Sequence, residues 1–89
     1  MSKAIYVTCT VSEGVFSSEF HINIKDSSYY VDRVNVQVSQ LPHNGDEVEG
    51  KVIAYLVEEK GDQALIELPG EPVAGGLRTW VSKADLVFA

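Results

Sequence analysis

The sequence has little of several residue types that would indicate a function. Cys9 is the only cysteine among 89 residues, so the chain forms no internal disulfide and no multi-thiolate metal site. Lys and Arg number seven against thirteen Asp and Glu, which gives a net charge of −6, and no run of bases occurs. Because this charge repels phosphate backbones, we expect no binding to nucleic acid.

Long apolar runs are also absent. The longest, 52–57, is six residues, far short of the roughly 20 that span a bilayer. The first residues contain one lysine and lack the continuous apolar core, about 7–15 residues long, of a signal peptide. These features predict a cytoplasmic protein that does not interact with membranes.

The motifs of common enzymes and cofactor sites are missing as well. Neither GxSxG nor GxGxxG occurs, and the spacing of the two histidines, His21 and His43, does not preorganise a metal site. Cys9 shares the register of the apolar residues around it, so we expect an inward, unreactive thiol. The sequence therefore predicts a protein that is not an enzyme and holds no metal or other cofactor.

Alternation of apolar and polar residues is the main pattern that is present. Residues 5–11 and 16–24 alternate with a period of two, typical of strands that bury one face. The turn sequence 58–62 separates two further β-rich segments, which predicts a hairpin over 52–68. We expect a single all-β domain of antiparallel strands over 1–89.

Three segments are less regular. Residues 31–41 fit both a strand and a helix, and their valines favour the strand. Prolines and glycines in 69–76 predict a turn-rich loop that is no strand interior. Residues 82–85 are typical of one short 3₁₀ turn, with Ser82 as its cap.

The last 45 residues thus run strand, long hairpin, loop, short strand, single turn and short strand. This order, with the phrase TWVSKADLV, resembles an SH3-like small barrel over roughly 45–88. The resemblance implies short antiparallel strands curled around one core, and two packed β half-units are the alternative. It implies no binding of proline-rich ligands, because the acidic-aromatic segment and paired tryptophans of peptide-binding SH3 domains are absent.

The chain also contains a weak internal similarity. YVDRVNV from Tyr30 matches WVSKADL from Trp80 by residue class, and Phe20 and Ile22 match Ile66 and Leu68. Alternating strands resemble one another by default, so the similarity has two explanations. It suggests an internal duplication of about 3–41 and 47–89.

The negative charge is concentrated in one segment. Residues 46–71 hold eight acids and two bases, and so account for the whole net charge of −6. An acidic surface attracts basic partners, although such charges also maintain solubility and prevent edge aggregation. The leading hypothesis is a noncatalytic module that binds either another protein, which the acidic charge predicts to be basic, or a second copy of itself. The expected contact residues are Glu58, Glu59, Asp62, Tyr55 and Trp80.

Aromatic residues allow a second hypothesis. Tyr6, Tyr29, Tyr55 and Trp80 fall out of step with the main apolar face of their strands; we expect Tyr55 in the core, whereas Trp80 fits either core or surface. The alternative function is a β-barrel that binds a small molecule near Trp80. Its site residues would be Tyr30, Gly75, Gly76 and Trp80.

Overall fold

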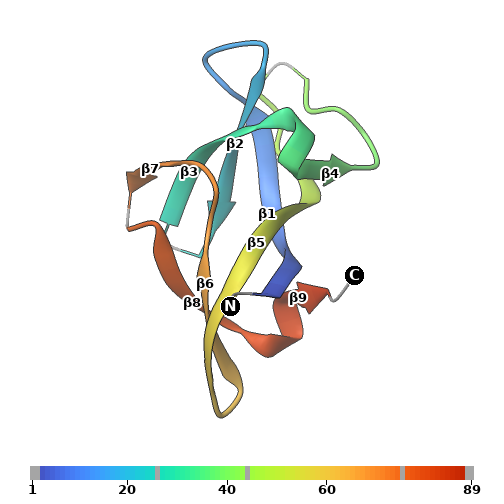
Figure 1. Cartoon of the computed structure of the whole chain (residues 1–89). Helices are drawn as coiled ribbons and strands as arrows, with labels where there is room; N and C mark the ends of the chain where they lie inside the picture. Colours follow the sequence, from blue (N-terminus) through green and yellow to red (C-terminus); the bar gives the residue numbers. More distant parts are fainter. Residues whose placement is uncertain (1–2, 26, 44, 75, 88–89) are drawn as a thin grey trace.

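The protein folds as an antiparallel β-sheet with two isolated 3₁₀ turns (Figure 1). The computed structural model describes residues 3–25, 27–43, 45–74 and 76–87. The strands are β1 (Lys3–Glu13), β2 (Glu19–Ile24), β3 (Ser27–Asp32), β4 (Val36–Val38), β5 (Val48–Lys60), β6 (Gln63–Glu67), β7 (Glu71–Ala74), β8 (Arg78–Ser82) and β9 (Leu86–Val87), and the turns are η1 (Arg33–Asn35) and η2 (Lys83–Asp85). The all-β prediction is confirmed.

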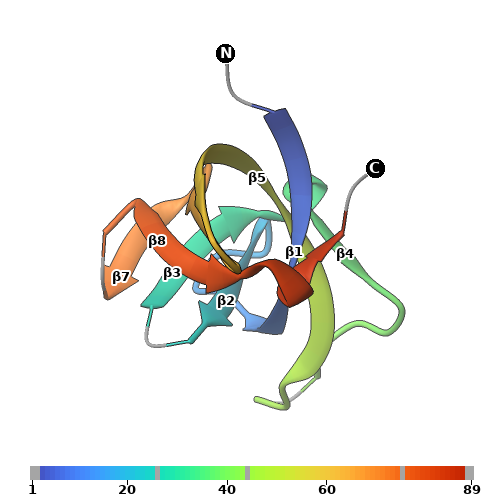
Figure 2. The same ribbon diagram turned by 90° about the horizontal axis from the view of Figure 1, so that it is seen from below.

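The strands form one sheet that curls into a half-barrel (Figures 1 and 2). Its order is β7-β3-β2-β1-β5-β6-β8, with β4 paired to β5 and β9 paired to β1. The long strands β1 and β5 pair with each other over nine residues at the centre of this order. The predicted hairpin over 52–68 is present as β5 and β6, and its tip projects at the bottom of Figure 1.

The core lies on the inner, concave face of the sheet. Alternate residues of each strand point inward, as the period of two predicts, and each fully buried Val or Ile side chain contributes about 1.5–3 kcal/mol. Cys9 is buried among them, as expected. The buried apolar residues are Ile5, Val7, Cys9, Val11, Phe20, Ile22, Ile24, Tyr29, Val31, Val36, Val52, Ala54, Ala64, Ile66, Leu68, Val81 and Leu86.

The segment 31–41 is not the continuous strand that its valines favour. After Asp32 the chain makes the 3₁₀ turn η1, and it resumes as the short strand β4. The carboxylate of Asp32 accepts a hydrogen bond from the Val34 backbone N–H at 3.2 Å, which stabilises the turn. Val34 is thereby 87% exposed.

The prediction that the proline- and glycine-rich segment 69–76 is a loop and no strand interior is wrong for four of its residues, which form β7. This strand pairs with β3, and Pro72 lies within it opposite Tyr29. Pro is tolerated on an edge strand, where one side of the backbone needs no ladder hydrogen bonds. Gly75 lies outside the described residues.

Each half of the chain contains a ladder that corresponds to one in the other half. Phe20 pairs with Val31 across β2 and β3, and Ala64 pairs with Val81 across β6 and β8. The ladders thus match Phe20 to Ala64 and Ile22 to Ile66, two residues away from the match that the sequence suggests. The match of Tyr30 to Trp80 agrees with the 3₁₀ turns, since each residue lies three positions before one, while the duplication itself stays a prediction.

The ends of the two halves correspond too. The turn η2 repeats the geometry of η1, with the Ser82 hydroxyl accepting from the Ala84 backbone N–H at 3.2 Å. The strands after the two turns pair equivalently, Val36 with Val52 and Leu86 with Val7. The chain therefore has two 3₁₀ turns at corresponding places, where the sequence predicts only the second.

Candidate interaction site

A half-exposed apolar area lies on the outer, convex face of β5, β6 and β8. We call Tyr55, Leu65 and Trp80 the outer patch. Leu65 lies opposite Trp80, and Tyr55 lies opposite Glu67, two residues from Leu65. Leu65 is thus a direct cross-strand neighbour of Trp80 and a diagonal neighbour of Tyr55, which places the three side chains on one stretch of the outer face.

The exposure of Tyr55 corrects the expectation that it is a core residue. Val52 and Ala54 point inward, and the period of two then directs Tyr55 to the opposite face. Tyr55 is 39% exposed and Trp80 is 38% exposed. Tyr29, also out of step by sequence, is fully buried, and its hydroxyl donates to the Gly76 carbonyl at 2.8 Å.

A β-bulge in β5 brings an acid to the edge of the outer patch. The register with β6 shifts between Leu56 and Glu58, so Val57 is the extra residue of the bulge. Without this shift, Glu58 would follow the inward parity of Leu56; with it, Glu58 lies opposite Leu65. The bulge has a signal in the sequence: Glu58 is an acid at a position where strict alternation would place an inward, apolar residue.

Two acids of the hairpin are neutralised locally. Glu59 forms an ion pair with Lys83 (Oε1–Nζ 3.1 Å), and Glu67 forms one with Arg78 (Oε1–Nε 2.9 Å). Among the residues that the structure describes, neither Glu58 nor Asp62 has an ion-pair partner. These two carboxylates are therefore the available acids near the outer patch.

The acidic segment 46–71 does not form one surface. Glu49 lies at the start of β5, Asp46 lies two residues before the strand, and Glu58 lies near its end. At about 3.3 Å per residue, nine residues of strand separate Glu49 from Glu58 by about 30 Å. The acids around the start of β5 and the acids of the β5–β6 hairpin therefore form two separate groups. Only the hairpin group adjoins the outer patch.

The equivalent outer face of the first half has different chemistry. Ser12, His21 and Tyr30 form a row across β1, β2 and β3. The Ser12 hydroxyl lies 3.4 Å from Nδ1 of His21, and the His21 and Tyr30 rings are 5.3 Å apart. This polar row occupies the place that Leu65 and Trp80 take in the second half.

Of the four residues expected around a small-molecule site, the structure describes Tyr30, Gly76 and Trp80. Tyr30 lies on β3 opposite His21 and Glu71, and Trp80 lies on β8 opposite Leu65, towards the two ends of the strand order. No described contact joins Tyr30 with Trp80. The Gly76 carbonyl accepts the hydrogen bond from Tyr29, and Gly75 lies outside the described residues.

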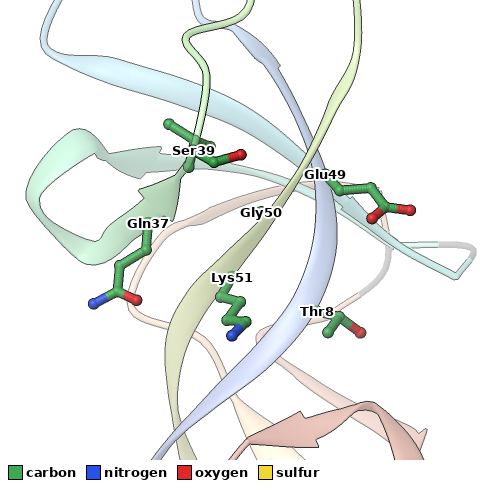
Figure 3. A pocket seen from close by; sticks show the side chains of 7 residues that line it. Thr8, Gln37, Ser39, Glu49, Gly50 and Lys51 are labelled. Carbon is green, nitrogen blue, oxygen red and sulfur yellow. The ribbon is translucent and has the colours of Figure 1, made fainter.

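A hollow of about 610 Å³ lies elsewhere, where β4 joins β5 (Figure 3). Lys51 is paired with Gln37 on one side and Thr8 on the other, and these three residues lie side by side along it. Gly50 allows the close approach of β4, because a Cβ there would lie 2.8 Å from the Gln37 carbonyl oxygen. The hollow is not evident from the sequence, since the valine alternation of 31–41 does not separate β4 from β3.

The structure adds two observations about other kinds of site. In the described part of the chain, no group of three or more His, Cys, Asp and Glu residues could hold a metal ion. Within the same residues, no helix has the length and apolar character needed to cross a membrane. Comparisons of the chain with protein-family models, curated proteins and solved structures found no significant match.

Proposed function

We propose that the chain is a noncatalytic interaction module that binds a protein partner through the outer face of β5, β6 and β8. The observation that supports this most is the outer patch, where Tyr55 and Trp80 remain more than one-third exposed on paired strands. Tyr and Trp are enriched at binding hot spots because they bury a large area at low conformational cost. The ladders hold these side chains in place before a partner arrives, which lowers the entropy cost of binding.

The available carboxylates favour a basic partner. Glu58 lies beside Leu65, and Asp62 lies at the hairpin tip. Unpaired charges at the rim of an apolar surface increase association rates and select partners of opposite charge. Glu59 and Glu67 contribute less, because each already has a cation within 3.1 Å.

Capture from a lysate of the source cells, followed by titration of the purified partner, tests the proposal. The variants are Tyr55→Ser, which removes the apolar ring from the patch, and the double variant Glu58→Lys with Asp62→Lys. The matched control is Asp46→Lys with Glu49→Lys, which makes the same charge change at the far end of β5. All variants are first compared with the wild type by circular dichroism.

We expect the first two variants to bind the titrated partner at least tenfold more weakly, a loss of about 1.4 kcal/mol or more. The control should retain wild-type affinity at the same ionic strength. Equal weakening by the control would show that only net charge matters. Unchanged binding of Tyr55→Ser would remove the outer patch from the proposal.

Binding of a small polar molecule is the second candidate function, and its support is the hollow beside β4. Lys51 and Gln37 offer a cation and an amide there, and Glu49 offers a carboxylate. An NMR screen of small polar fragments tests it through the backbone signals of Thr8, Gln37 and Lys51. Shifts confined to the outer patch, or none at all, would reject this function.

A further inference from the structure

The strand β8 lacks a neighbour that its counterpart β3 possesses. Tyr30 of β3 and Trp80 of β8 hold equivalent places in the fold, since each lies three residues before a 3₁₀ turn, η1 or η2. The far edge of β3 is covered by β7. In the described part of the chain, β8 pairs with β6 alone and ends the sheet (Figure 1).

Hydrogen bonds at the two ends of the β6–β8 ladder show which backbone groups face the open edge. The Lys83 N–H donates to the Asp62 carbonyl at 2.9 Å, and the Leu68 N–H donates to the Leu77 carbonyl at 3.0 Å. Directly bonded pairs alternate along an antiparallel ladder, so odd-numbered residues of β8 bond to β6. The N–H and C=O groups of the even-numbered residues, Arg78, Trp80 and Ser82, therefore point away from β6.

The edge of β8 also lacks the features that usually prevent strand addition. The other end of the sheet, β7, contains Pro72 and has a register shift against β3. Prolines, bulges and edge charges block pairing with further strands. β8 has neither proline nor bulge, and its one charged side chain, Arg78, is paired with Glu67.

We propose that a second copy of this chain covers this edge, with the two β8 strands antiparallel about a twofold axis at Trp80. In this register Trp80 lies opposite Trp80 of the other copy, and Arg78 lies opposite Ser82. All three outward backbone positions then form hydrogen-bonded pairs, and no like charges lie opposite each other. A twofold interface requires such a self-complementary surface.

The side chains of the outer face fit the same register. The central row becomes Leu65–Trp80–Trp80–Leu65 across the two copies, an aromatic cross-strand pair flanked by aliphatic residues. The rows beside it join Glu67 and Arg78 of one copy to Ser82 and Gln63 of the other. This inference goes beyond the proposed function, because dimerisation needs no other protein, and the dimer doubles the Leu65–Trp80 part of the outer patch.

Sedimentation equilibrium of the purified chain tests the dimer. We expect a concentration-dependent monomer–dimer equilibrium in the wild type, and Trp80→Lys should weaken it at least tenfold, because two lysines would face each other across the axis. The matched control is Tyr30→Lys, the same charge at the equivalent position of β3, whose edge β7 covers. Tyr30→Lys should dimerise like the wild type; a strictly monomeric wild type up to about 1 mM overturns the proposal.

Amide hydrogen exchange measured by NMR on the wild type tests the same interface without a variant. The N–H groups of Arg78, Trp80 and Ser82 should be unprotected at low concentration and become protected as the dimer forms. Those of Thr79 and Val81 should be protected throughout, since they bond to β6. A dimer that leaves the Trp80 amide unprotected would mean a different interface and would overturn the proposal. Failure of the partner-capture experiment would count against the proposed function, not against the dimer, because dimerisation needs no other protein.

Discussion

The substitution Gly70→Ala tests whether the close contact between the start of β7 and β3 stabilises the fold. A Cβ at residue 70 would lie 2.4 Å from the Tyr30 carbonyl oxygen and 2.7 Å from Cγ2 of Val31. The first contact is with backbone, which cannot rotate away. The β3–β7 ladder, or the residues leading into it, must therefore move to admit one methyl group.

The expected loss is about 3 kcal/mol of unfolding free energy, the upper end of the range for overpacking a well-packed site. A chain of this length has a total stability of roughly 4–13 kcal/mol. Since 1 kcal/mol shifts the melting temperature of a domain this size by about 4–8 °C, Gly70→Ala should lower it by more than about 10 °C.

Urea and thermal unfolding, followed by circular dichroism, measure the effect against two other glycines. Gly61 has φ +61°, and a Cβ there meets no atom within 4 Å, so Gly61→Ala should cost only the left-handed strain of about 1–2 kcal/mol. At Gly76 the nearest atom would be 3.8 Å away, an ordinary contact, and the change should stay within about 0.5 kcal/mol. If Gly70→Ala proves no more harmful than Gly76→Ala, the close contact between residue 70 and β3 does not stabilise the fold.

Two further predictions concern buried and capping groups. Burial raises the pKa of Cys9 from 9.0 to about 12. Between these values the thiol ionises in the unfolded chain but not in the folded one, so the free energy of unfolding should fall by at most about 1.4 kcal/mol per pH unit as pH rises. Urea titrations should show a smaller slope in Cys9→Ala, and an equal slope would show that Cys9 does not cause the pH dependence. Asp32→Ala and Ser82→Ala should each cost about 1 kcal/mol, because each removes the side-chain acceptor of a 3₁₀ turn; chemical denaturation measures both, and a loss at only one site would show that the two turns are not energetically equivalent.

The inner face of the sheet could be predicted from the sequence, because burial imposes a period of two. Ile5, Val7 and Val11 are buried as their alternation indicates, and Cys9 lies among them. The hairpin of β5 and β6 is likewise evident from its polar turn between two β-rich segments. These elements depend on local chemistry and on one-sided burial.

Features that depend on a change of register were not predictable in the same way. The turn η1 interrupts the valines of 31–41, and the bulge at Val57 reverses the parity of β5. Each inserts residues that belong to neither face, so a strict period assigns the wrong side to the residues after the insertion. By sequence Pro72 argues against a strand, whereas an edge position with one unpaired side accepts it.

The side chains of the outer face are not determined by burial in the core, and on this face the two halves of the chain differ. At equivalent positions the first half has His21 and Tyr30 and the second has Leu65 and Trp80, although the core partners beside them pair alike. The apolar pair adds little to the core, because Trp80 stays 38% exposed, and exposed apolar area on a paired strand favours association. The pair lies on the half whose end strand, β8, has no covering neighbour among the described residues. Apolar side chains and an open backbone edge thus coincide at β8, so an added strand would gain main-chain hydrogen bonds from the edge and specificity from the side chains.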